Sequence, residues 1–342
     1  MNTMPEPIIA LAVALVLISI ALGLFYPRRG LIPRWRRARQ QAERIRVEDA
    51  LKHILVCEMN GDRFSANSLA GALQITVDQA ADLQLDMEHR NLLHAEADSI
   101  RLTPVGRQSA LHILRAHRLW ERYLADETGI DELEWHGQAE SFEHELTPEE
   151  AEALAARLGN PTHDPHGDPI PSAEGEMKPH GGLPLTAASV DEPLRIVHLE
   201  DEPQAVFAQL LAEGLYPGME VRVVERSPHR IRFWASDDEH LLAPVVAANV
   251  SVAPLEDGNG VDLAGPWLSD LAPGERGEVV AISSRCRGLE RRRLQDLGFL
   301  PGAEIQAELT SSGGDPVGYR MRGALIALRK EQADLIRIQR AT

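Results

Sequence analysis

Apolar residues recur at intervals of three and four over much of the chain, which is the spacing of one face of an α-helix. Six segments before residue 160 show this pattern: residues 47–59, 66–73, 77–90, 104–127, 130–145 and 148–158. Polar capping residues precede several of them, including Ser65, Thr76 and a capping box that begins at Thr147. The first half of the chain is therefore predicted to be mainly helical.

Short alternating segments interrupt the helices at residues 92–96 and 100–102, and this pattern predicts a β-hairpin. A helix, a helix-turn-helix and a β-ribbon in this order predict a winged helix-turn-helix over residues 47–104. The helices that follow predict a second, all-α domain over residues 105–171. A stretch rich in Gly, Pro, Ser and Ala then predicts a linker over residues 172–190.

The C-terminal part contains an internal repeat. Pro217-Gly218 and Pro301-Gly302 match at an offset of 84 residues, and each pair follows a short helical pattern and precedes a β-patterned segment. The repeat predicts two small β-barrels, over residues 191–255 and 266–340. Together with the helical part, this gives an α+β multidomain fold.

The hydrophobic pattern of residues 1–27 predicts a transmembrane anchor. Residues 8–26 are apolar except for Ser19 and glycine, which is close to the lower limit for spanning the hydrocarbon of a bilayer. Eight arginines fall in the juxtamembrane residues 28–46 and none precedes the apolar run. The positive-inside bias therefore predicts a single-pass protein of the cytoplasmic membrane with its C-terminal domains in the cytoplasm. The basic segment is also expected to lie against anionic lipid.

The remainder of the chain is strongly acidic. The net charge is −17, and because residues 1–46 carry +6, the rest carries −23. Such a field opposes binding to nucleic acid. The two cysteines, Cys57 and Cys286, are far apart, so no disulfide framework or cysteine zinc site is indicated. No nucleotide loop, catalytic triad or hydrolase signature is present, and we predict no enzymatic activity.

Histidine and carboxylate side chains gather at helical spacing in the all-α part. Three pairs make up this group: His117 and Glu121, His136 and Glu140, and Glu143 and His144. Residues three or four apart share a helix face, so two consecutive helices would each present an imidazole and carboxylates. Ligands of this kind suit a transition-metal ion. The alternative is that these residues decorate solvated helix faces.

Several motifs resemble those of the diphtheria-toxin-repressor and manganese-regulator family of metal-dependent repressors. In order, they are Leu102-Thr-Pro-Val-Gly-Arg107, His117-Arg-Leu-Trp-Glu121, Glu143-His144 and His166-Gly-Asp-Pro-Ile-Pro171. The second barrel resembles FeoA, the SH3-like partner of bacterial ferrous-iron transport, through residues 294–302, Arg322-Gly323 and Ala327-Leu-Arg329. The first barrel resembles both FeoA and the SH3-like third domain of the repressors. The resemblance implies a metal-binding and dimerisation domain over residues 105–171, a homodimer, Fe(II) or Mn(II) as cofactor, and operator DNA as partner.

The resemblance also implies two metal sites. The primary site falls on Asp49, Glu140, Glu143 and His144, and the ancillary site on His117, Glu121 and His136. Lys52 stands where manganese-type members have a carboxylate, which predicts a weakened or relocated second metal. Ancillary ligands from the third domain do not map cleanly, although Glu202 and Gln204 are near in sequence. His163 and His166 fall in a proline-rich segment and are predicted as surface-loop residues.

The predicted DNA-reading helix, residues 77–90, is acidic. Asp78, Asp82 and Asp86 recur on one face, where a major-groove reader usually carries neutral or basic side chains. The candidate DNA-contacting residues are Gln79, Ala80, Arg63 and Arg101. Two functions remain open: a membrane-anchored, metal-dependent DNA-binding regulator of metal homeostasis, or an Fe(II)-responsive accessory module that does not bind DNA and contacts a ferrous-iron transporter through its FeoA-like domains.

Overall fold

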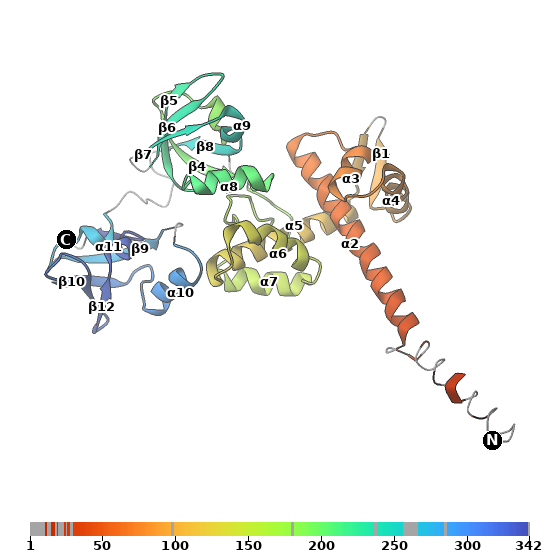
Figure 1. The fold of residues 1–342 in the computed structure, drawn as a ribbon, viewed down its shortest axis with the longest axis horizontal. Coiled ribbons are helices and arrows are strands. Elements are labelled where there is room, and N and C mark those ends of the chain that lie inside the picture. Colours follow the sequence, from red (N-terminus) through yellow and green to blue (C-terminus); the bar gives the residue numbers. More distant parts are fainter. Residues whose placement is uncertain are drawn as a thin grey trace, which may run out of the picture. The chain divides into compact units, whose positions relative to one another are not determined.

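The computed structural model describes residues 30–340 except 97–98, 179–180, 236–237, 256–265 and 284–285, together with residues 11, 15–17, 19, 24, 26 and 27. The chain divides into two compact units, Met1–Ile113 and Leu114–Thr342. Each unit is described by itself below, with the element labels of Figure 1.

The first unit contains a helix, a helix-turn-helix and a β-hairpin, in the predicted order. Its elements are α2 (Leu31–Asn60), α3 (Ala66–Ala72), α4 (Val77–His89), β1 (Leu93–Glu96), β2 (Ser99–Leu102) and the start of α5 (Pro104–Glu127). Ser65 and Thr76 cap α3 and α4, as predicted, and each side chain accepts a hydrogen bond from the backbone N–H three residues on. Leu51, Ile54 and Met87 are buried in the core of this unit.

Helix α2 begins at Leu31 rather than at the predicted Val47. The segment from Leu31 to Arg46 is helical because it is rich in arginine, glutamine and alanine, which favour helix. At its other end the helix stops where Gly61 adopts the left-handed conformation, with φ of 75°. This is the usual C-terminal signal, and it confirms the predicted end.

The predicted membrane anchor, residues 1–27, lies largely outside the described residues. Among the residues that the structure does describe, no helix is both long enough and apolar enough to cross a membrane. The single-pass topology therefore stays a prediction.

The helical part of the second unit contains the remainder of α5, the 3₁₀ turn η1 (Glu132–Glu134), α6 (Trp135–Phe142) and α7 (Pro148–Arg157). The prediction of one helix over residues 130–145 is wrong. The Asp131 side chain accepts a hydrogen bond from the backbone N–H of Leu133 and starts the 3₁₀ turn, so α6 begins only at Trp135. α7 begins after its predicted cap, Thr147.

Two small β-domains complete the second unit (Figure 1). The first contains β3 (Leu183–Pro184), η2 (Leu185–Ala187), β4 (Pro193–Leu199), α8 (Gln204–Ala212), β5 (Glu220–Arg226), β6 (Ile231–Ala235), β7 (Asp238–Leu242), α9 (Pro244–Ala247) and β8 (Val250–Pro254). The second contains η3 (Leu268–Asp270), β9 (Arg276–Ile282), α10 (Gly288–Asp296), β10 (Glu304–Thr310), β11 (Val317–Met321), β12 (Ala324–Leu328), α11 (Lys330–Ala333) and β13 (Ile336–Arg340). Their antiparallel sheets have the orders β3-β8-β4-β5-β6-β7 and β13-β9-β10-β11-β12.

The two β-domains repeat the same element order, which confirms the internal repeat. Helix α10 of the second domain corresponds to α8 of the first, and β10 corresponds to β5. Both pairs are related by the offset of 84 residues found in the sequence. Gly218 and Gly302 at the matching turns have positive φ, 99° and 83°, which glycine adopts without strain. Each domain has its own apolar core, around Phe233 in the first and Phe299 in the second.

Residues 172–190 are not a linker over their whole length. Leu183–Pro184 form β3, which pairs with β8, and Leu185 is fully buried in the core of the first β-domain. Backbone pairing and one apolar side chain hold the end of this stretch on the domain, although its composition is that of a linker.

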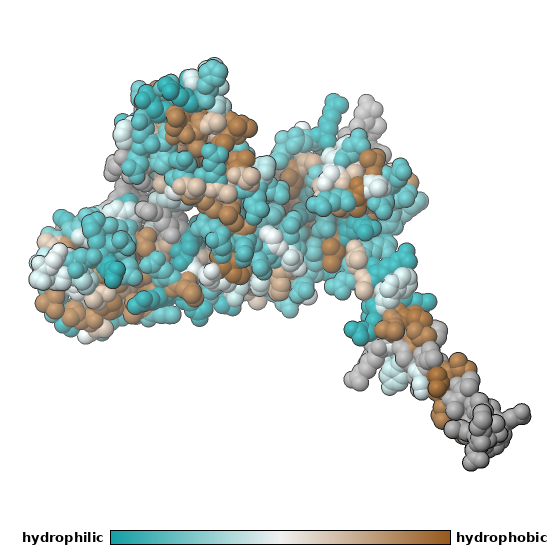
Figure 2. All heavy atoms as spheres, viewed as in Figure 1, coloured by the Kyte–Doolittle hydropathy of each residue, from teal (hydrophilic) through white to brown (hydrophobic). Residues whose placement is uncertain are grey.

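An apolar area interrupts the largely hydrophilic surface of the C-terminal β-domain, near β10 and β12 (Figure 2). Leu309 on β10 is 56 % exposed and Leu325 on β12 is 45 % exposed. Both lie beside Gly318 of β11, at which an added Cβ would be 3.4 Å from each leucine. Strand β12 is at the edge of its sheet, so this area is open to a partner.

Candidate metal centre

Helix α5 places His117 and Glu121 on one buried face, as their spacing predicts. His117 Nε2 lies 3.1 Å from Glu121 Oε1. His117 Nδ1 lies 2.5 Å from Oε2 of Glu143, the buried residue that ends α6. The imidazole of His117 therefore has a carboxylate at each nitrogen.

His136, in the first turn of α6, completes a group of three. Its Nδ1 lies 3.4 Å from Glu121 Oε1, and its ring centroid is 4.9 Å from that of His117. One ligand atom from each of His117, Glu121 and His136 can be chosen so that all lie within 4.8 Å of one another. These are the residues predicted for the ancillary site, and the structure brings them together.

A loop between α7 and the first β-domain adds two acidic or imidazole side chains that were not predicted as ligands. Asp164 and His166 are buried, and with Glu121 they form a second group whose ligand atoms lie within 4.8 Å of one another. His166 Nδ1 is 3.8 Å from Glu121 Oε2. The prediction that His166 is a surface-loop residue is wrong, because it is only 3 % exposed. Glu121 is common to both groups.

The burial of this loop follows from its backbone. Asp164 Oδ1 accepts hydrogen bonds from three successive backbone N–H groups, those of residues 166–168, at 2.9, 3.0 and 2.9 Å. Gly167 has φ of 101°, and a Cβ there would lie 2.0 Å from the carbonyl oxygen of Val197 on β4. The Asp-Pro-His-Gly sequence is thus a signal for a tight turn. Its proline content had suggested solvent exposure instead.

The first β-domain contributes Asp201, which was also not predicted. Asp201 Oδ2 lies 2.9 Å from His136 Nδ1 and 3.8 Å from His166 Nδ1. Glu202, one of the two neighbours named from the sequence, lies 3.6 Å from His136 Nε2 with its side chain 71 % exposed. The other, Gln204, donates a hydrogen bond of 2.9 Å to a backbone carbonyl of η1. Nothing in the spacing of the chain marks Asp201 among its acidic neighbours.

Three buried atoms of the cluster have no hydrogen bond among the described residues, although charged neighbours lie close: Glu121 Oε1, His136 Nδ1 and His166 Nε2. Buried polar atoms almost always have partners, and an unpaired one costs about 1–3 kcal/mol. A divalent cation would satisfy the Glu121 and His136 atoms. The donor set holds carboxylate oxygen and imidazole nitrogen without sulfur, which fits Fe(II) or Mn(II).

Protonation of the cluster agrees with this assignment. Burial alone would raise the pKa of Glu121, but the surrounding histidines, His117 foremost, hold it well below its usual range. Burial and neighbouring carboxylates raise the pKa of Asp164 well above its usual range. Burial alone would lower the pKa of His136, but the close carboxylates, Asp201 foremost, raise it to about 12. A cation bound here would compete with protons for these side chains.

A second layer of charged groups supports the loop. Arg118, next to His117 on α5, donates a hydrogen bond of 2.5 Å to the Pro169 carbonyl and one of 3.2 Å to Asp168 Oδ1. His198 Nε2 on β4 lies 3.4 Å from Asp168 Oδ2. Burial alone would raise the pKa of Asp168, but His198 and Arg118 lower it. Such outer groups orient the residues that bind a metal.

The four residues predicted for the primary site are spread over both units. Glu143 and His144 are adjacent, with His144 Nε2 3.7 Å from Glu143 Oε1. Glu140 Oε1 lies 3.5 Å from His136 Nε2. Asp49 lies on α2, in the first unit. This ligand set stays a prediction.

The predicted DNA-contacting residues differ in exposure. Arg63, Gln79 and Arg101 are exposed. Ala80 is fully buried, so it packs in the core of the helix-turn-helix and offers no surface to a base. The Gln79 side chain is engaged in the cap of α4, where its Oε1 accepts a hydrogen bond of 3.0 Å from the Thr76 N–H.

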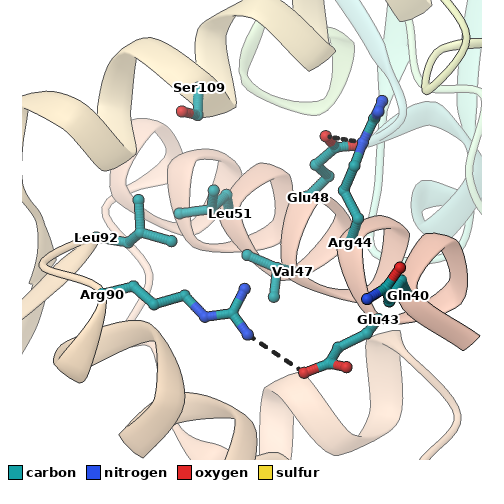
Figure 3. Close-up of a pocket in the computed structure, with 9 residues that line it drawn as sticks. All are labelled: Gln40, Glu43, Arg44, Val47, Glu48, Leu51, Arg90, Leu92 and Ser109. Carbon is teal, nitrogen blue, oxygen red and sulfur yellow. Dashed lines mark hydrogen bonds and ion pairs between the residues drawn. The ribbon is translucent and has the colours of Figure 1, made fainter.

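Carboxylates engage Arg90, just after α4. Arg90 Nη2 lies 2.7 Å from Asp86 Oδ2 and 3.2 Å from Glu43 Oε1. Figure 3 shows the Arg90–Glu43 pair at a pocket of about 400 Å³, lined by α2 together with Leu92 and Ser109. The charge of Arg90 is therefore balanced within the first unit, and the exposed face of α4 stays acidic.

Comparison with known proteins identifies two regions of the chain. Residues 103–172 match the family described as iron dependent repressor, metal binding and dimerisation domain, and residues 267–340 match the FeoA domain. The diphtheria toxin repressor of Corynebacterium diphtheriae is 33% identical over 154 residues, which cover 42% of this chain and 68% of that protein. The iron-dependent repressor IdeR of Mycobacterium tuberculosis is 40% identical over 86 residues, 25% of this chain and 37% of that protein.

Solved structures share the fold of about three fifths of the chain. A manganese-dependent transcriptional repressor in complex with manganese superposes with a TM-score of 0.57 at 26% identity, and covers 61% of this chain and 100% of that one. The manganese regulator SloR superposes with a TM-score of 0.52 at 21% identity, and covers 61% of this chain and 98% of that one. The second likeness shows the fold alone.

Proposed function

Because this chain belongs to the diphtheria toxin repressor family of metal-dependent transcriptional repressors and carries a FeoA domain, we propose that it senses Fe(II) or Mn(II) and binds operator DNA as a homodimer when loaded. The family is not enzymatic. The match of residues 103–172 to a dimerisation domain supports the homodimer. The observation that carries the proposal is the buried cluster in which two groups of possible ligands share Glu121.

In this proposal the ion is held by residues from four segments of the second unit. They are His117 and Glu121 of α5, His136 of α6, Asp164 and His166 of the loop, and Asp201 of the first β-domain. The bound cation supplies a positive charge among these carboxylates. Glu121 ties α5 to the other segments, because it belongs to both groups. Without the ion, no single ligand joins these segments, and they are held less firmly.

The predicted primary ligands, Asp49, Glu140, Glu143 and His144, are proposed as a second metal site. A ligand from α2 would connect the DNA-reading unit to the metal-binding helices, and a loaded dimer would then hold its two DNA-reading units at a fixed spacing. The contact of Glu143 with His117, at 2.5 Å, supports coupling between the two sites.

The test measures Mn(II) binding and DNA retention on the same full-length protein. We expect wild type to bind Mn(II) and to retain DNA from the promoter of its own operon with Mn(II), but not with chelator. Glu121→Gln keeps the shape of the side chain and removes the shared charge, so both activities should fall at least about tenfold. Glu149→Gln, at an exposed position on α7, is the matched control. Equal Mn(II) binding by the two variants would refute the site.

A second candidate function is an accessory role in ferrous-iron transport without DNA binding. Two observations favour it: the exposed carboxylates Asp78 and Asp82 on α4, and the exposed apolar area around Leu309 and Leu325 on the FeoA domain. Intact Mn(II) or Fe(II) binding without any DNA retention would support this candidate, with a ferrous-iron transporter as the partner.

We further propose that residues 1–27 anchor the protein in the cytoplasmic membrane with the C-terminal domains in the cytoplasm. The apolar run of residues 8–26 and the arginines that follow it support this topology.

A further inference from the structure

Helix α10 of the FeoA domain packs closely against the end of α5. Gly288, the first residue of α10, has φ of 53°, and a Cβ there would lie 2.2 Å from the Thr128 carbonyl oxygen. A Cβ on Gly129 would in turn lie 3.4 Å from Leu289 Cδ1. The backbone of Gly288 packs directly against the backbone of Thr128, and there is no room for a side chain between them. Such close packing indicates complementary surfaces.

Charges on the two sides of this contact are complementary. Arg287 Nη1 and Arg291 Nε lie 3.8 and 3.9 Å from Asp126 Oδ1, and Arg292 Nη1 lies 3.5 Å from Glu127 Oε2. Asp126 Oδ1 is buried and has no hydrogen bond among the described residues. The basic N-terminal half of α10 thus faces the acidic end of α5.

Arg287 reaches further, to the two segments that carry His136 and His166. Its guanidinium lies 5.9 Å from the ring centroid of Trp135, and its Nη2 donates a long hydrogen bond of 3.4 Å to the Pro165 carbonyl. Its side chain is only 16 % exposed. Trp135 immediately precedes His136, and Pro165 immediately precedes His166. Arg287 of the FeoA domain therefore contacts the residue before His136 and the residue before His166.

The space beside these residues would let them shift if Arg287 were absent. A cavity of about 220 Å³ is lined by Trp135, His166, Phe207 and Arg287, among others. The rings of Trp135 and His166 are 5.9 Å apart, centroid to centroid. Trp135 and His166 thus have empty space beside them, and the Arg287 guanidinium lies against the Trp135 ring.

We propose that Arg287 is a positioning residue through which docking of the FeoA domain and loading of the metal cluster are coupled. The inference rests on the proposed metal site. With α10 docked, Arg287 holds the Trp135 ring and the Pro165 carbonyl, next to His136 and His166, where these histidines lie close to Glu121. Coupling free energy is reciprocal, so metal binding also strengthens the docking of α10. The FeoA domain then reports the metal state of the sensor to any partner that binds it.

The test combines Mn(II) titration with hydrogen exchange of residues 288–296 in the full chain. In wild type, Mn(II) should slow exchange in this segment. Arg287→Ala should weaken Mn(II) binding about fivefold or more and abolish the Mn(II)-dependent protection. Arg293→Ala, at an exposed position on the same helix, is the control. If Arg287→Ala matches Arg293→Ala in both measurements, the coupling does not exist.

A charge reversal keeps the proposal testable if Arg287→Ala does not fold. Arg292→Glu places a carboxylate opposite Glu127, which also pairs with Arg157 at 2.9 Å, and should weaken both Mn(II) binding and Mn(II)-dependent protection of α10. Arg292→Lys keeps the positive charge and should leave both near their wild-type values. If Arg292→Glu matches Arg292→Lys in both measurements, the proposal is overturned. Absence of Mn(II) binding by the wild-type protein would overturn the proposed function itself.

Discussion

His53 is a half-buried imidazole in the first unit with no charged partner in its described contacts. Its Nε2 lies 3.3 Å from Ser68 Oγ and 3.6 Å from Cys57 Sγ. Burial lowers the pKa of His53. The folded state therefore favours the neutral ring, and this contribution to stability is full above the unfolded pKa of about 6.5 and is lost as the pH falls through the lower, folded pKa.

We expect the local stability of α2 and α3 to drop between pH 7.5 and pH 5.5, and His53→Gln to drop less. Hydrogen exchange of the two helices, corrected for the intrinsic rate at each pH, measures this difference. Both proteins contain the same other titratable groups, so their contributions cancel in the comparison. The same pH dependence in both proteins would show that protonation of the buried His53 does not destabilise the folded state.

Residue spacing predicted part of the metal cluster and could not predict the rest. His117 and Glu121 lie one helical turn apart, and such a pair meets in any regular helix. Asp201 meets His136 only because the first β-domain packs on the helices. Asp164 enters through a tight turn whose closeness to β4 depends on Gly167. Contacts made by tertiary packing leave no periodic trace in the sequence.

At the scale of elements, capping residues were the most reliable signal. Ser65, Thr76 and Thr147 each begin a helix as predicted, because a side-chain oxygen satisfies a backbone N–H that the helix leaves unpaired. Periodicity alone failed at residues 130–145, where the Asp131 cap starts a 3₁₀ turn. It also placed the start of α2 too late, because a helix face rich in arginine carries no apolar stripe.

The acidic face of α4 gives a prediction at this scale. If α4 reads DNA, the exposed carboxylates of Asp78 and Asp82 could accept hydrogen bonds from cytosine amino groups. Asp78→Ala with Asp82→Ala should then weaken operator binding by about tenfold or more, since one such base contact is worth about 1–3 kcal/mol. Electrophoretic mobility shift with Mn(II) measures it.

The control for this pair removes the same charge elsewhere, at the exposed residues Glu149 and Glu331. Their change to alanine should leave operator affinity unchanged or slightly raised, because it only reduces repulsion from phosphate. DNA binding that appears only in the α4 variant would mean that native α4 is not a DNA reader. That result would favour the accessory role in iron transport.

Over the whole molecule, charge is segregated: residues 1–46 carry +6 and the rest carries −23. Within α2, four arginines between residues 34 and 39 are exposed, and Trp35 among them is 62 % exposed. Each arginine near an anionic membrane contributes about 1 kcal/mol of attraction, whereas the acidic remainder is repelled. This polarity would favour contact of the basic part of α2 with an anionic membrane surface.

If residues 1–27 anchor the chain, the apolar run and the basic helix should make separable contributions to membrane binding. In flotation with vesicles that contain phosphatidylglycerol, the full chain should float at both 50 mM and 500 mM NaCl, because insertion of residues 8–26 is insensitive to salt. A chain without residues 1–27 should float only at 50 mM NaCl, since salt screens the arginines. Changing the arginines at 34, 36, 37 and 39 to glutamine in that shorter chain should weaken its flotation at 50 mM NaCl, because half of the eight arginines are removed. A full chain that stays unbound at 500 mM NaCl would exclude the anchor and leave electrostatic attraction as the sole membrane contact.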